Sequence, residues 1–167
     1  MAYDVGVDVG SVSINCMVID EDRRVVLETP YLRHFGLFHE EAHRLLRNLL
    51  DPAFFRGAPD IRSITFTGVH GRLLSEILGA PFEVETIAQV LGVTHVVPGV
   101  RTVISIGGQD AALFQLTHEG QSWRIESFNM NGPCASGTGS FIDQQAERLA
   151  QSLYGPEFHM NQEKLQQ

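Results

Sequence analysis

A weak internal repeat constrains the fold of this chain more than any other feature of its sequence. When the sequence is shifted on itself by 97 positions, Gly10 aligns with Gly107, and the polar turn at 20–23 aligns with residues 117–120. In each copy, apolar residues with strand-like alternation precede the glycine and follow it. Two copies of one glycine-tipped hairpin can close on a ligand from opposite sides. The repeat therefore predicts two similar lobes with a cleft between them.

The apolar patterns predict a mixed α/β fold class. Residues 1–98 are expected to form a first lobe. It would contain three antiparallel strands at 5–9, 14–19 and 24–32, a helix at 38–50 and a strand parallel to its neighbour at 61–67. Two short helices are expected to follow, at 72–78 and 87–95. Residues 99–167 are expected to begin a second lobe that the chain does not complete, with strands and a helix at 103–106, 112–116, 122–128 and 141–153.

Both glycine turns have the composition of a phosphate-binding loop. Gly10 has no Cβ, which permits a tight turn and lets the N–H groups of residues 10–13 converge on an anion. Ser11 and Ser13 add hydroxyl donors. Asp8 repels phosphate by charge, unless a hard cation such as Mg²⁺ lies between them. The second turn offers matching groups at Gly107, Gly108, Gln109 and Asp110. For each motif alone, an ordinary hairpin turn is an open alternative.

Charge and hydropathy exclude several classes of protein. Twelve Lys and Arg against twenty Asp and Glu give a net charge of −8, which opposes attraction to nucleic acid or to an anionic membrane. No apolar run approaches the roughly 20 residues that span a bilayer, and the first residues lack a secretory signal. We expect a cytoplasmic protein without a nucleic-acid or membrane partner. Neither a Walker loop nor the Gly-x-Gly-x-x-Gly fingerprint is present in the sequence.

Four motifs carry a resemblance to a known family. They are Gly-Val-Asp-Val-Gly-Ser at 6–11, Thr-Gly-Val-His-Gly-Arg at 67–72, Ile-Gly-Gly-Gln-Asp at 106–110, and Asn-Gly-Pro-Cys-Ala-Ser-Gly-Thr-Gly-Ser-Phe at 131–141. In this order they resemble the ATPase activators of 2-hydroxyacyl-CoA dehydratases, a family that includes the ATPase subunits of benzoyl-CoA reductases. The resemblance covers nearly the whole chain.

The resemblance implies an actin-like ATPase fold of the ribonuclease H-like type, with MgATP between two lobes. It also implies a homodimer that holds one [4Fe–4S] cluster. ATP turnover would drive a low-potential electron into a 2-hydroxyacyl-CoA dehydratase or a related acyl-CoA reductase, with a ferredoxin- or flavodoxin-type protein as electron donor. Family members continue through a second cluster cysteine and an adenosine-binding segment, so the chain resembles an N-terminal piece of a longer protein.

The resemblance assigns a role to each candidate site residue. Asp8 would hold Mg²⁺ through water, and the phosphates would be bound by Gly10, Ser11, Ser13, Gly107 and Gly108. Gln109 and Asp110 would orient the attacking water, and Cys134 would ligate the cluster. Several positions depart from the family pattern: a lysine is replaced by Asn15, an aspartate by Ser105, a histidine by Gln89, and Asn-Asp-Lys by Asn-Gly-Pro at 131–133.

The cysteines and histidines differ in their surroundings. Cys134 precedes a predicted helix, whose N-terminus favours a thiolate, whereas Cys16 lies mid-strand and is expected to be a buried hydrophobe. His39 and His43 fit His-Glu-x-x-His, a zinc-binding pattern, but no third ligand is indicated, and two solvated histidines on a helix edge are the favoured interpretation. For His70, in the turn at 67–72, the family resemblance implies a structural role near the cleft.

Two other functions remain open for the same fold. One is a sugar or small-carboxylate kinase, which needs an acceptor pocket and an aspartate base that the sequence does not reveal. The other is a non-catalytic nucleotide sensor, which is consistent with Asn15 and Ser105.

Overall fold

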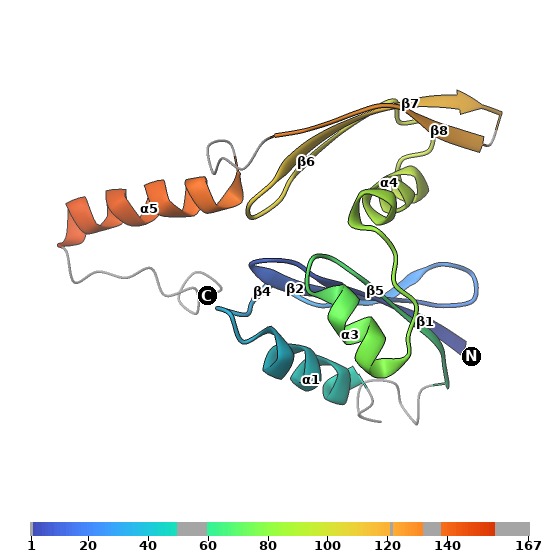
Figure 1. Cartoon of the computed structure of the whole chain (residues 1–167), viewed down its shortest axis with the longest axis horizontal. Helices are drawn as coiled ribbons and strands as arrows, with labels where there is room; N and C mark the ends of the chain where they lie inside the picture. The colour runs from blue at the N-terminus through green and yellow to red at the C-terminus, as the bar shows by residue number, and fades with distance from the viewer. Residues whose placement is uncertain (1, 50–59, 121, 132–137, 156–167) are drawn as a thin grey trace. The chain divides into compact units, whose positions relative to one another are not determined.

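The computed structural model describes residues 2–49, 60–120, 122–131 and 138–155. The chain divides into two compact units, Met1–Val100 and Arg101–Gln167, and each is described here by itself (Figure 1). In the part of the chain that the structure describes, no helix is long and apolar enough to cross a membrane.

The first unit is built on one mixed sheet with the strand order β3-β2-β1-β5, in which β4 also pairs with β2. Its strands are β1 (Ala2–Val9), β2 (Ser13–Ile19), β3 (Val25–Glu28), β4 (Leu32–Arg33) and β5 (Asp60–Thr67). β1 is antiparallel to β2 and parallel to β5, so the predicted hairpin and the parallel return are confirmed.

The predicted single strand at 24–32 is wrong, because two short strands replace it. Thr29 stays bonded to the middle of β2: its N–H donates to the Cys16 carbonyl at 2.9 Å, and its Oγ1 accepts from the Cys16 N–H at 2.9 Å. Pro30 follows and has no N–H to continue the ladder, so pairing resumes only at β4.

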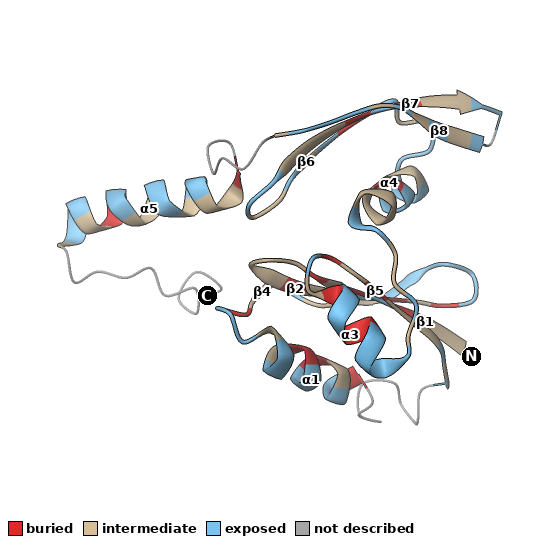
Figure 2. Cartoon of the chain, in the orientation of Figure 1, coloured by how far each residue is buried: buried red, intermediate tan, exposed pale blue. Residues whose placement is uncertain are grey.

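The core of the first unit lies on one face of this sheet. Alternate residues of β1, namely Val5, Val7 and Val9, are buried there, together with Phe66 of β5. Helices α1 (Phe38–Leu49) and α3 (Gly71–Leu78) cover this face, and the buried stripes of both are visible in Figure 2. Each fully buried aliphatic or aromatic side chain contributes roughly 1.5–3 kcal/mol.

Helix ends in the first unit follow local turn chemistry. α3 ends at Gly79, whose φ of 63° is the left-handed cap expected of a terminal glycine. α4 (Glu85–Val96) begins two residues before its predicted start.

The second unit contains an antiparallel sheet in the order β6-β7-β8, followed by helix α5. Its elements are β6 (Thr102–Ile106), β7 (Ala111–Glu119), β8 (Ser122–Met130) and α5 (Gly139–Tyr154). Phe114 is fully buried, and its ring centroid lies 5.1 Å from that of Phe128.

The internal repeat is also visible in the backbone. Arg23 has a φ of 62°, and Gly120, the residue aligned with it, has a φ of 66°. A left-handed conformation is unusual for arginine and ordinary for glycine. The two copies therefore turn in the same way at equivalent positions, although their side chains differ.

Candidate functional site

The first glycine turn connects β1 to β2 through residues 10–13. The Gly10 N–H donates to the Ser13 carbonyl at 2.9 Å, and the flanking residues Val9 and Ile14 are register partners. The Gly10 N–H, predicted to be an anion donor, instead closes the turn. The remaining candidate donors for an anion at this turn are the N–H groups of residues 11–13.

The second glycine turn, between β6 and β7, is closed in the same way. The Gly107 N–H donates to the Asp110 carbonyl at 2.7 Å. The first N–H groups of α5 reach the carbonyls of this turn, from Gly139 to Gly107 at 2.9 Å and from Ser140 to Gly108 at 2.9 Å. Donors at a helix N-terminus have no acceptor within the helix, so the turn satisfies them. Gln109 and Asp110 have exposed side chains.

Asp8 and Thr67 bring two unsatisfied oxygen atoms together on the sheet. They are register partners in the parallel strands β1 and β5. Asp8 Oδ1 and Thr67 Oγ1 are both buried, and neither has a hydrogen-bond partner within the described part of the chain. Buried polar atoms of this kind call for a water molecule or an ion. Because Mg²⁺ prefers oxygen ligands and often keeps its waters, these atoms fit the cation expected at Asp8.

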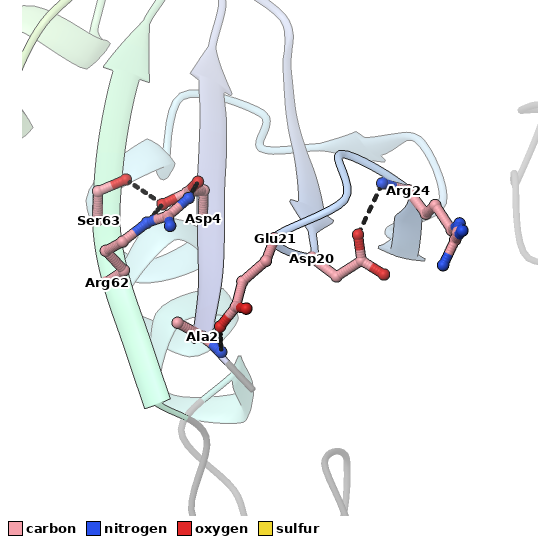
Figure 3. Close-up of polar contacts among 7 residues, drawn as sticks. All are labelled: Ala2, Asp4, Asp20, Glu21, Arg24, Arg62 and Ser63. Atoms are coloured by element: carbon pink, nitrogen blue, oxygen red, sulfur yellow. Dashed lines mark hydrogen bonds and ion pairs between the residues drawn. The ribbon is translucent and has the colours of Figure 1, made fainter.

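Asp8 differs sharply from Asp4, which lies on the same strand and the same face. Asp4 accepts hydrogen bonds from the Arg62 guanidinium and from Ser63 Oγ, the latter at 2.8 Å (Figure 3). These bonds hold the pKa of Asp4 below its usual value. Burial without a compensating partner raises the pKa of Asp8. Asp4 is thus a paired structural carboxylate, whereas Asp8 is a carboxylate with a buried oxygen that has no hydrogen-bond partner among the described residues.

Gly68 allows the end of β5 to approach Asp8 closely. Its φ of 86° is left-handed, and a Cβ at this position would lie 2.5 Å from both Asp8 Oδ1 and the Val9 carbonyl oxygen. No other residue fits this close approach without displacing one of them. The glycine of the Thr-Gly motif at 67–68 is therefore a condition for the placement of Asp8.

Two histidines lie beside the first glycine turn. His34 is 3% exposed, and its Nε2 lies 3.1 Å from the Gly10 carbonyl oxygen. The main-chain N–H of His70 donates to the Val9 carbonyl at 2.9 Å, and its ring stacks on Phe38 at a centroid distance of 4.1 Å. Burial, with smaller contributions from His34 and His39, lowers the pKa of His70.

Sequence reasoning missed His34 and Thr67 as parts of this site. Neither belongs to the first glycine turn: Thr67 lies beside it through strand register, and His34 reaches it from a loop. The sequence predicted a parallel neighbour for the 61–67 strand without naming it, and the structure identifies that neighbour as β1, which places Thr67 next to Asp8.

The remaining candidate residues lie elsewhere. His39 and His43 are exposed on α1, and the described residues include no group of three His, Cys, Asp or Glu side chains that could hold a metal ion. Cys16 is buried as predicted, and burial raises the pKa of its thiol to about 12, which leaves it unreactive. Cys134 lies outside the described residues.

A pocket of about 370 Å³ lies along the sheet face that carries Asp8, Asn15 and Thr67. Its wall also includes Glu28 and Glu83. Three carboxylates repel a phosphate, so this pocket is not a candidate anion site. The candidate anion donors are those of the glycine turn.

Comparisons with known proteins agree on one family. Residues 5–154 match the model of the BadF/BadG/BcrA/BcrD ATPase family. The chain is 29% identical over 147 residues to the (R)-2-hydroxyglutaryl-CoA dehydratase activating ATPase of Acidaminococcus fermentans, covering 88% of this chain and 54% of that protein. It is 30% identical over 152 residues to the activator of lactoyl-CoA dehydratase of Anaerotignum propionicum, covering 90% of this chain and 55% of that protein.

A solved structure shows the same relationship. The activator of the 2-hydroxyisocaproyl-CoA dehydratase from Clostridium difficile, with bound ADPNP, has a TM-score of 0.72 and 29% identity, over 88% of this chain and 52% of that one. The fold is thus the α/β, actin-like fold of the activator ATPases, as predicted. The chain spans about half the length of the curated relatives it matches.

Proposed function

This chain belongs to the BadF/BadG/BcrA/BcrD ATPase family, and we propose that it is the phosphate-binding part of an ATP-dependent activator. Its partner would be a 2-hydroxyacyl-CoA dehydratase or a related acyl-CoA reductase, into which ATP hydrolysis drives a low-potential electron. The observation that carries the proposal is the pair of glycine turns closed by the same hydrogen bond, with a buried, unsatisfied carboxylate oxygen beside the first.

In this proposal the first turn binds phosphate oxygens. The N–H groups of residues 11–13 and the hydroxyls of Ser11 and Ser13 donate to the anion. Hydrogen bonds to a charged acceptor are each worth roughly 1.5–3 kcal/mol. Asp8 and Thr67 hold the hydrated Mg²⁺ through their unsatisfied oxygens. When bound, the cation neutralises charge on the transferring phosphoryl group.

The second turn supplies the remaining groups. Gly107 and Gly108 approach the phosphates with their main chain, and Gln109 and Asp110 orient the attacking water. The exposure of both side chains is consistent with contact to solvent. Positioned donors and a positioned water molecule are the main contributions that a protein makes to phosphoryl transfer.

Electron transfer is the second half of the proposed activity. Cys134 would be one of two cysteines that each subunit of a homodimer contributes to a [4Fe–4S] cluster, which needs four thiolates. When bound, the cluster would supply the low-potential electron, with a ferredoxin- or flavodoxin-type protein as the proposed donor. The names of the relatives support a dehydratase partner, and the family resemblance supports the cluster.

The test compares two readouts, ATP hydrolysis and dehydratase activation, in the complete gene product. Asp8→Asn should lower hydrolysis at least about 100-fold and abolish activation, because the cation loses its carboxylate. Cys134→Ser should abolish activation and bound iron while hydrolysis stays near that of the unmodified protein. Asp22→Asn, at an exposed surface position, serves as the matched control.

Each alternative function gives a different result in the same assay. Transfer of the phosphoryl group to a sugar or carboxylate would identify a kinase. Binding of ATP without hydrolysis would identify a nucleotide sensor. This outcome is consistent with Asn15, which puts a neutral side chain opposite Asp8 where the family pattern has a lysine. Unchanged hydrolysis in Asp8→Asn would show that the nucleotide site lies elsewhere.

A further inference from the structure

In both glycine turns, the carbonyl of the first glycine is held by a hydrogen-bond donor. The Gly107 carbonyl accepts from the Gly139 N–H at 2.9 Å, and the Gly10 carbonyl lies 3.1 Å from His34 Nε2. The repeat aligns Gly10 with Gly107, so the two carbonyls are equivalent. The donors are not, since one is a helix N-terminus and the other a side chain. Both donors nevertheless hold the carbonyl of the first glycine in place.

The contacts of His34 determine which ring nitrogen carries the proton. The Gly36 N–H donates to His34 Nδ1 at 3.1 Å, so Nδ1 is an acceptor. The neutral imidazole then has its proton on Nε2, which donates to the Gly10 carbonyl. The ring is fixed at both nitrogens, and neighbouring rings enclose it: Phe38 at 6.0 Å and His70 at 5.9 Å between centroids.

His34 also holds the other side of the turn through its main chain. Its N–H donates to the Val12 carbonyl at 3.1 Å. The carbonyls of Gly10 and Val12 therefore both point toward His34. In a trans peptide the N–H of the next residue points opposite to the carbonyl. The N–H groups of Ser11 and Ser13 are consequently both turned away from His34.

We propose that His34 is a positioning residue for phosphate binding, which aims the Ser11 and Ser13 N–H groups at the anion by holding the Gly10 and Val12 carbonyls behind them. The inference rests on the proposed function, because it takes the first turn as a phosphate site. His34 itself does not touch the nucleotide.

Two substitutions separate the Gly10 contact from the rest of the histidine. The amide of His34→Gln reaches as far as Nε2 and can donate to the Gly10 carbonyl. The shorter amide of His34→Asn can replace the Nδ1 contact to Gly36 but not the contact to Gly10. Both variants keep the main-chain bond to Val12. His43→Asn, at an exposed position of α1, is the control.

The experiment measures the Kd of MgATP and of adenosine by calorimetry with the complete gene product. We expect His34→Asn to weaken MgATP about tenfold, or 1.4 kcal/mol. His34→Gln and the His43→Asn control should stay within about threefold of the unmodified protein. Adenosine should bind all of them alike, since the turn contacts only phosphates. A merely structural loss would weaken both ligands and would affect His34→Gln as well.

The outcomes distinguish this inference from the proposed function. If the unmodified protein does not bind MgATP, the proposed function fails and the inference fails with it. If it binds MgATP but His34→Asn binds equally well, the proposed function stands and the role of His34 is refuted. Should His34→Asn fail to fold, the His34→Gln variant decides. Because this variant keeps a donor to the Gly10 carbonyl, a tenfold weaker affinity for MgATP with unchanged adenosine binding would refute the Gly10 contact as the reason that His34 matters for phosphate binding.

Discussion

The two glycine turns are closed by the same main-chain hydrogen bond, but different donors hold the carbonyl of their first glycine. Both are closed by the N–H of the first glycine, at 2.9 Å in the first turn and 2.7 Å in the second. The first is held by a histidine side chain from a loop, and the second by the start of a helix. The repeated element is thus a main-chain geometry, which donors of different kinds hold in the two copies.

The units around the two turns differ more than the turns do. The sheet of the first unit has one face covered by α1 and α3, with Val9 and Phe66 fully buried. In the described part of the second unit, Ile104 and Ile106 of β6 are 70% and 60% exposed. Burial of apolar surface therefore contributes more to the first unit.

The largest losses of stability should come from removing one buried aromatic ring from the core of each unit. Phe66→Ala and Phe114→Ala each remove a fully buried ring, which costs about 3–5 kcal/mol. Phe114→Ala should lie at the low end, because its neighbour Phe128 is 44% exposed and can shift into the space. Urea unfolding followed by fluorescence of Trp123 in β8 reports on the second unit, and circular dichroism reports on both.

If the units unfold independently, Phe66→Ala shifts only the dichroism transition and leaves the Trp123 midpoint unchanged. A common shift of both signals in both variants would contradict independent unfolding, because it would show that the two units unfold as one cooperative unit.

A smaller effect is expected at two left-handed glycines, one in each unit. Gly68→Ala places a Cβ 2.5 Å from Asp8 Oδ1 and should cost about 2–4 kcal/mol through strain and steric overlap. Gly120 has nothing within 4 Å of its missing Cβ, so Gly120→Ala should cost only about 1–2 kcal/mol of backbone strain. Urea unfolding measures both. Equal losses would mean that the β5 end moves away from Asp8 without cost.

The smallest effect tests the turns themselves. A Cβ on Gly107 would lie 3.1 Å from the Asp110 carbonyl oxygen, and one on Gly10 would lie 3.4 Å from that of Ser13. We expect Gly107→Ala to lose about 1 kcal/mol, and Gly10→Ala no more than about 0.5 kcal/mol. Thermal unfolding at matched protein concentration compares them. A greater loss for Gly10→Ala would show that the His34 contact makes the first turn the more rigid of the two.

Local signals carried most of the fold prediction. The alternation in β1 and the glycine that ends α3 are short-range features, and both were placed correctly from the sequence. The division of 24–32 into two strands was not predicted, although it follows Pro30, which has no N–H to continue the ladder with β2.

The site was predictable only in part. Asp8 and the glycine turns stand out in the sequence, because a carboxylate next to a glycine turn is a recognisable pattern. The contact of His34 with Gly10 spans 24 residues, and nothing in the intervening sequence specifies it. Thr67 required the register of β5 against β1, which no local pattern determines.

The docking of α5 on the second turn has an electrostatic consequence. A helix N-terminus has about half a positive elementary charge, concentrated on its first N–H groups. In this protein those groups face the carbonyl oxygens of Gly107 and Gly108, whose partial negative charges would otherwise repel an approaching anion. The helix dipole thus neutralises the back of the second turn, whereas the first turn has only the single N–H dipole of a neutral imidazole behind Gly10. The carbonyls of the second turn therefore face a larger positive dipole than the Gly10 carbonyl of the first.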